Sequence, residues 1–75
     1  MSTVFAERLK KERELNGFSQ QEMARQLDIS FYTYRNYEAL GIRHREPNMD
    51  MIVKIATTLD TSADYLLGRD LANLN

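Results

Sequence analysis

Apolar residues recur along this chain at spacings of three and four positions, which predicts short helices rather than strands. The first helix is expected over about residues 3–16. In it Phe5, Leu9 and Arg13 recur at four-residue steps, and Gly17 suits the left-handed residue that closes a helix.

Two helices with a very short connection are expected next. Ser19 and Glu22 have the spacing of a capping box, in which the serine oxygen accepts from the backbone three residues on and the glutamate reaches back. A second helix therefore starts at Ser19. After a three-residue interruption, Ser30 can cap a third helix over about residues 31–39. Residues 19–39 together predict a helix-turn-helix.

Two more helices are expected after a loop over residues 40–47. Asn48 can cap a fourth helix whose buried stripe has three-four spacing and consists of Ile52, Ile55, Ala56 and Leu59. Ser62 can cap a fifth over residues 63–67, which should stop at Gly68. The pattern as a whole predicts about five helices and an all-α fold.

The length of 75 residues suits one domain, expected over residues 1–70 and followed by a short C-terminal tail at residues 71–75. Hydrophobic residues make up 43% of the chain, and no apolar run approaches the roughly 20 residues that cross a bilayer. The N-terminus lacks the pattern of a secretory signal. We therefore expect a soluble, cytoplasmic protein that does not associate with membranes.

The sequence offers few groups for metal binding or catalysis. With no cysteine and one histidine, neither a thiolate zinc site nor a multi-histidine site can form, so no metal and no cofactor are expected. A small helical bundle has little room for a catalytic pocket, and His44 has no evident catalytic partner. We therefore expect neither enzymatic activity nor a small-molecule substrate.

The net charge of −1 argues mildly against nucleic-acid binding, because lysine and arginine drive that binding by displacing counterions from phosphates. The placement of the charges weakens this objection. Residues 1–47 carry eight basic and seven acidic residues, whereas residues 48–75 carry two basic and four acidic ones. The more positive part of the chain thus contains the predicted helix-turn-helix.

Several short segments are together typical of one family. They are Ser19-Gln20-Gln21-Glu22-Met23-Ala24, Ile29-Ser30, Tyr37-Glu38, Glu46-Pro47 and Ala63-Asp64-Tyr65-Leu66-Leu67-Gly68. Through them, residues 7–68 resemble the helix-turn-helix family of phage repressors, Cro-type proteins and related bacterial transcriptional regulators of the xenobiotic-response-element type. The resemblance implies a compact five-helix lambda-repressor-like DNA-binding domain, whose third helix enters a major groove.

The resemblance implies that the front and outer face of the third helix contacts bases, through Phe31, Tyr32, Thr33, Arg35 and Asn36. Arginine can pair with guanine and asparagine with adenine through two hydrogen bonds, and apolar side chains can contact a thymine methyl group. The alternative for Arg35 and Asn36 is a solvated surface. For Phe31 and Tyr32 it is core packing, with Phe31 against Tyr34, and both possibilities stay open.

Contacts with the DNA backbone are implied at Ser19 and Gln20, where the family places the start of its second helix against a phosphate. We expect Ser19 to serve as cap and contact together, and the alternative is a cap alone. In the loop, Arg43 and Arg45 belong to a dense basic cluster suited to backbone or minor-groove contact. His44 between them is equally well explained as part of a solvated loop.

Arg13 places a charge on an otherwise apolar helix face, where burial without a partner is costly, so it needs a carboxylate. The resemblance supplies a partner, since an arginine at this position of the family pairs with a glutamate at the end of the third helix. That residue is Glu38 here. We therefore expect a structural salt bridge between Arg13 and Glu38.

Three features depart from the family pattern. The stretch between Glu38 and Pro47 is about three residues longer than usual, and aromatic residues replace the commoner polar readers at the start of the third helix. Asp28 and Asp60 stand where glycine is common. Aspartate tolerates left-handed backbone angles better than most residues, so we expect both turns to form.

The resemblance implies a sequence-specific regulator of transcription that binds double-stranded DNA, encoded by a phage or a host. We expect a repressor that occludes a palindromic operator as a homodimer. The expected pairing surface lies around residues 65–74 and includes Leu66, Leu67, Leu71 and Leu74. The alternative is an antitoxin-like or anti-repressor module, in which the aromatic residues of the third helix bind a protein.

Overall fold

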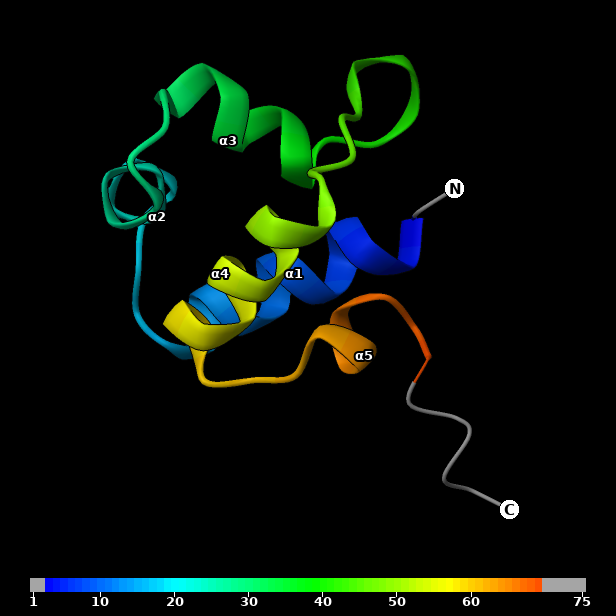
Figure 1. Cartoon of the computed structure of the whole chain (residues 1–75). Helices are drawn as coiled ribbons and strands as arrows, with labels where there is room; N and C mark the ends of the chain where they lie inside the picture. The colour runs from blue at the N-terminus through cyan, green and yellow to red at the C-terminus, as the bar shows by residue number, and fades with distance from the viewer. Residues whose placement is uncertain (1–2, 70–75) are drawn as a thin grey trace.

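The computed structural model describes residues 3–69, which form five α-helices and one 3-10 turn without any strand (Figure 1). The elements are α1 (Thr3–Leu15), α2 (Gln20–Leu27), α3 (Phe31–Glu38), η1 (Gly41–Arg43), α4 (Met49–Leu59) and α5 (Ala63–Leu66). The expected all-α fold with five helices is confirmed for this part of the chain. Each of α1, α3 and α5 ends one residue before the predicted position, a difference within the usual fraying of helix ends.

The predicted N-caps are confirmed. Ser19, Ser30, Asn48 and Ser62 each accept a hydrogen bond from the backbone N–H three residues on. At α2 the capping box is complete: Ser19 Oγ accepts from the backbone N–H of Glu22 at 3.0 Å, and Glu22 Oε1 accepts from that of Ser19 at 2.7 Å. These bonds satisfy amides that have no partner inside the helix.

The two aspartates in place of glycine take the left-handed conformation, as expected. Asp28 has φ 60° and ends α2, and Asp60 has φ 57° and ends α4. The backbone N–H of Asp28 donates to the carbonyl of Arg25, and that of Ile29 to the carbonyl of Ala24. The turn that follows α2 therefore keeps its tight geometry without glycine.

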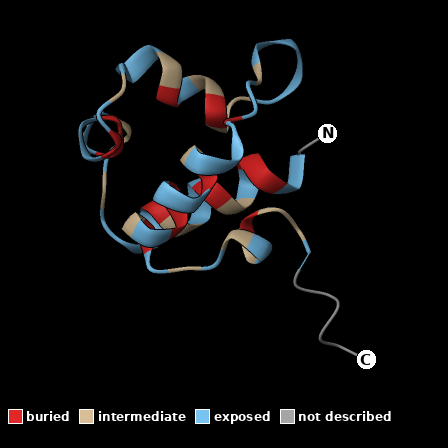
Figure 2. Ribbon diagram, in the orientation of Figure 1, coloured by how far each residue is buried: buried red, intermediate tan, exposed pale blue. Residues whose placement is uncertain are grey.

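The core lies where α1, α4 and α5 meet the helix-turn-helix (Figure 2). Its largest fully buried side chains are Phe5, Leu9, Met23, Leu27, Tyr34, Ile55, Leu59 and Leu66. The predicted stripe of α4 is buried as well, with Ile52 and Ala56 beside Ile55 and Leu59. No helix within residues 3–69 has the length and apolarity to cross a membrane.

The helix-turn-helix stands at one edge of the molecule. Helix α3 packs against α2 and α1, and its opposite side is covered by no other described element (Figure 1). The chain then leaves α3 through a loop of residues 39–48, which projects beside the end of that helix. The fold thus leaves one face of α3 and the adjoining loop exposed.

Candidate nucleic-acid interface

Helix α3 has a buried side and an exposed side, and its aromatic residues divide between them. Tyr34 is fully buried and Tyr37 is 8% exposed, with their rings edge to face at a centroid distance of 6.1 Å. Phe31 and Tyr32 are 39% and 59% exposed. The possibility that Phe31 and Tyr32 belong to the core is therefore wrong, because no other element within residues 3–69 buries the start of α3 on their side.

The exposed aromatic rings contact Arg35. Its guanidinium carbon lies 4.9 Å from the centroid of the Tyr32 ring and 6.0 Å from that of Phe31. Both distances are within the range of cation–π attraction, and the residues are three and four positions apart on one helix. The three side chains thus form one cluster at the front of α3, in which the rings restrict where the guanidinium can lie.

Thr33 and Asn36, the other expected base-contacting residues, are partly exposed. The hydroxyl of Thr33 accepts a hydrogen bond from Ser30 Oγ at 2.9 Å, at the cap of the helix. The backbone carbonyl of Asn36 accepts from the N–H of Arg45 at 3.0 Å, which ties the loop to α3. Asn36 also lines three open hollows that border the exposed side of α3.

Each of these hollows has at least one basic side chain in its lining, and two of them have more than one. The first, called here the loop hollow, has a volume of about 460 Å³ and lies between α3 and the loop, with a lining that includes Tyr32, Asn36, Ile42, Arg43 and Arg45. The second, the α1 hollow, has a volume of about 330 Å³ and a lining that includes Lys10, Gln20, Arg35, Asn36 and Arg43. The fold therefore gathers four cations around the exposed side of α3.

Lys10 is a candidate that the sequence analysis missed. It lies in α1, remote in sequence from the helix-turn-helix, but lines the α1 hollow together with Arg35 and Arg43. A signal was present, because Lys10 precedes Arg13 by three residues and so shares its side of the helix. Arg13 was already expected to face α3.

The start of α2 carries Ser19 and Gln20 next to α3. Ser19 is exposed and serves as the cap described above. The side-chain amide of Gln20 donates from Nε2 to Glu38 Oε1 at 2.9 Å. Gln20 thus links the first turn of α2 to the last turn of α3, and its backbone N–H remains at the positive end of the α2 dipole.

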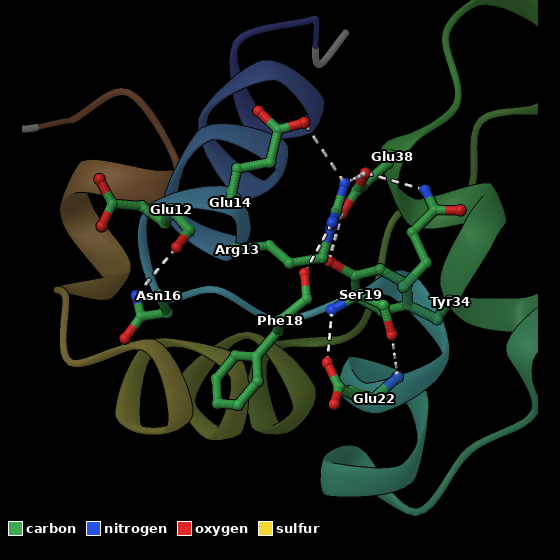
Figure 3. Close-up of polar contacts among 10 residues, drawn as sticks. Glu12, Arg13, Glu14, Asn16, Phe18, Ser19, Glu22, Tyr34 and Glu38 are labelled. Carbon is green, nitrogen blue, oxygen red and sulfur yellow. Dashed lines mark hydrogen bonds and ion pairs between the residues drawn. The ribbon is translucent and has the colours of Figure 1, made fainter.

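Arg13 reaches from α1 to Glu38 at the end of α3 (Figure 3). Arg13 Nε donates to Glu38 Oε2 at 2.7 Å, Nη2 donates to Oε1 at 3.2 Å, and Nη1 donates to the carbonyl of Phe18 at 2.8 Å. The side chains are only 10% and 4% exposed. Sequence reasoning expected this pair, and the structure brings the two residues together.

Two further groups complete the shell of the Glu38 carboxylate. Besides Gln20, the hydroxyl of buried Tyr34 donates to Glu38 Oε2. The hydrogen bond to Glu38 raises the pKa of Arg13. Burial and then the bond to this carboxylate raise the pKa of Tyr34. The Glu38 carboxylate therefore joins α1, α2 and α3 and fixes the orientation of α3 relative to the other two helices.

The loop after α3 is braced at its base. His44 Nδ1 donates to the carbonyl of Ala39 at 2.9 Å, and its ring meets Phe5 edge to face at 6.4 Å. His44 Nε2 lies 3.4 Å from Glu46 Oε2, and Pro47 is buried. A purely solvated role for His44 is wrong, since its side chain is only 15% exposed. Arg43 and Arg45 on either side of it are exposed.

The expected pairing surface is only partly accessible. Leu66 is fully buried in the core, so its assignment to a dimer interface is wrong. The reason is that α5 is a single turn that packs on α1 and α4, and Leu66 is the residue it inserts. Leu67 is partly exposed, and Leu71 and Leu74 lie outside the described residues.

Comparison with known proteins places this geometry in a family. The helix-turn-helix family matches residues 9–66. The HTH-type transcriptional regulator ImmR of Bacillus subtilis is 38% identical over 63 residues, which cover 84% of this chain and 47% of that protein. The SPbeta prophage-derived HTH-type transcriptional regulator YonR of the same organism is 42% identical, over 85% of this chain and 56% of its own length.

A relative from a second organism matches the chain to a similar extent. The cryptic phage CTXphi transcriptional repressor RstR of Vibrio cholerae is 39% identical, over 84% of this chain and 54% of its own. The chain thus spans about half the length of the curated relatives it matches. No solved structure gives a significant match. From its braced helix-turn-helix and these matches, the chain belongs to the helix-turn-helix family of phage-type repressors and related transcriptional regulators.

Proposed function

We propose that this chain binds double-stranded DNA in a sequence-specific manner and represses transcription by occluding an operator that overlaps a promoter. The observation that carries the proposal is the exposed side of α3, where Arg35 and Asn36 stand on a helix whose end is held by the Arg13–Glu38 pair. A rigidly held helix of this kind is what a major groove accepts.

The base contacts are assigned to the exposed side of α3. Arg35 bonds O6 and N7 of a guanine, and Asn36 bonds an adenine, because these are the bidentate partners of the two side chains. Phe31 and Tyr32 hold the guanidinium and present apolar surface to thymine methyl groups. Thr33 contacts the same groove from the first turn of the helix.

The backbone contacts surround this face. Ser19 and the backbone N–H of Gln20 meet a phosphate at the start of α2, because free amides and the helix dipole both favour an anion there. Arg43 and Arg45 meet phosphates from the loop, and we add Lys10 because it shares a hollow with Arg35 and Arg43. These contacts orient α3 without reading sequence.

The bound form is a homodimer on a palindromic operator, in the cytoplasm of the cell that holds the DNA. A single module with few basic residues binds weakly, and two recognition helices about 34 Å apart meet successive major-groove faces of a palindrome. Leu67, Leu71 and Leu74 remain the residues proposed for pairing, now without Leu66.

Selection of bound sequences from a randomised duplex pool, at fixed and stated salt, tests the proposal. We expect a palindromic consensus for the wild-type chain and a consensus relaxed at one base pair per half-site for Arg35→Ala. Lys11→Ala, which removes one positive charge from the exposed side of α1 outside the three hollows described above, is the control and should keep the full consensus. Absence of any enriched sequence at low salt would overturn the proposal.

A second candidate is favoured by the exposed aromatic residues. Phe31 and Tyr32 could dock into a partner protein, as in an antitoxin-like or anti-repressor module, because exposed aromatic side chains are common anchors of protein interfaces. The two functions differ in their response to salt. The affinity for DNA falls steeply with added salt, because salt reduces the free energy gained by releasing counterions. The affinity of an aromatic protein interface changes little.

A further inference from the structure

Ile42 is 99% exposed, at the centre of the η1 turn. Single exposed apolar residues are common on protein surfaces and need no explanation by themselves. Ile42 differs from such isolated residues in two respects. The loop that carries it is held by contacts at its base, and Ile42 lines the same hollow as the exposed side of α3. It also lies in the stretch that is longer than the family's usual connection.

The support is a set of contacts at the base of the loop. His44 donates through its ring to Ala39 and through its backbone N–H to the carbonyl of Gly41, at 2.9 and 3.1 Å. The backbone of Arg45 is bonded to that of Asn36, and the His44 ring rests against buried Phe5. An apolar tip held in this way loses little conformational entropy when it binds.

The loop hollow has two walls. One wall is the exposed side of α3, with Tyr32 and Asn36, and the other is the loop, with Ile42, Arg43 and Arg45. If α3 occupies a major groove, the DNA strand at the edge of that groove runs through the loop hollow, with its phosphates against Arg43 and Arg45. On its other side, this DNA strand borders a minor groove.

We propose that Ile42 enters this minor groove, next to the half-site read by α3, and makes the protein sensitive to bases that α3 does not contact. The inference rests on the proposed function. Apolar side chains enter minor grooves as wedges, with flanking cations on the phosphates. Guanine carries its 2-amino group on the floor of that groove, whereas A·T pairs present acceptors only. Ile42 therefore selects against G·C pairs at its position.

Inosine provides the test, because an I·C pair keeps the major-groove atoms of G·C but lacks the 2-amino group in the minor groove. Duplexes share the selected core and differ only in the adjoining pairs, which are A·T, I·C or G·C. We expect the full chain to bind the A·T and I·C duplexes alike and the G·C duplex about fivefold more weakly. Ile42→Ser should bind all three alike.

Leu40→Ser is the matched control. Leu40 is also apolar, 56% exposed and in the same loop, but it does not line the loop hollow. This variant should keep the discrimination against G·C, and urea melts of both variants should match the wild type. Equal binding of the three duplexes by the wild type, or discrimination that persists in Ile42→Ser, would overturn the inference while leaving the proposed function intact.

Two further outcomes would also count against the inference. If the pool yields no core sequence at all, the proposed function and the inference fail together. If Ile42→Ser reduces self-association in sedimentation but leaves the discrimination unchanged, Ile42 contacts a second protein chain rather than DNA.

Discussion

Arg13 and Glu38 form a two-point ion pair that joins α1 to the end of α3, with donor–acceptor distances of 2.7 and 3.2 Å. Both side chains are almost fully shielded from water. The pair therefore acts as the joint between the supporting helix and the helix proposed to read DNA. Removal of this ion pair is therefore expected to lower the stability of the fold, in addition to any effect on DNA recognition.

Arg13→Ala is expected to lower the free energy of unfolding by about 3–5 kcal/mol, because it leaves the Glu38 carboxylate buried without its cation. Urea melts at neutral pH measure the change. Lys11→Ala, on the exposed side of α1, is the matched control and should stay within about 0.5 kcal/mol of the wild type. A similarly small change for Arg13→Ala would show that the pair contributes little to stability.

Because Tyr34 is buried, we expect the folded chain to lose stability in alkali. Burial and the neighbouring carboxylate raise the pKa of Tyr34, so the hydroxyl stays protonated in the folded chain when an unfolded tyrosine ionises near pH 10. The contribution of Tyr34 is thus complete below about pH 10 and declines above it, by about 1.4 kcal/mol per pH unit. Burial also raises the pKa of Tyr37, which adds to the same slope.

Urea melts at several pH values between about 8 and 11, on both sides of the pKa of an unfolded tyrosine, measure how the free energy of unfolding changes with pH. Tyr34→Phe should reduce this slope by the equivalent of about one proton, so that only the part due to Tyr37 remains. An identical slope in wild type and Tyr34→Phe would contradict the assignment.

Arg35 and Tyr32 are expected to act on the same base pair. Arg35→Ala should cost about 1–3 kcal/mol at that base pair and relax its identity. Tyr32→Ala should relax the same position more weakly, because the guanidinium loses the ring 4.9 Å away. Tyr32→Phe retains the ring and should restore the preference. Relaxation of an A·T position as well would report the proposed contact of Tyr32 with a thymine methyl group, whereas an unchanged preference at the Arg35 base pair would contradict the support that Tyr32 gives to the guanidinium.

Arg43 is expected to weaken binding without altering sequence preference. Arg43→Ala should lower the affinity for all duplexes by a similar factor and reduce the slope of log affinity against log salt by about 1, since one phosphate contact is lost. Lys10→Ala should do the same if it meets a phosphate from the α1 hollow. Titrations at several salt concentrations measure both, with Lys11→Ala as the control for charge alone.

The local features of this protein can be predicted from its sequence alone. The caps at Ser19 and Ser30 were predicted because such bonds span three residues and depend only on neighbouring side chains. The left-handed turn at Asp28 followed from the tolerance of aspartate for that conformation. Arg13 was identified as a charge in need of a partner, although the partner, 25 positions away, came from the family resemblance.

Which aromatic side chains of α3 face outward depends on how the helices pack together. Phe31 and Tyr34 are indistinguishable as aromatic residues at helical spacing, yet one is exposed and the other buried, because only one side of α3 meets other helices. Likewise Leu66 belongs to the core, and Lys10 joins Arg35 and Arg43 across a hollow. Packing of this kind depends on how elements distant in sequence are arranged in space, whereas capping depends on a single turn of the chain.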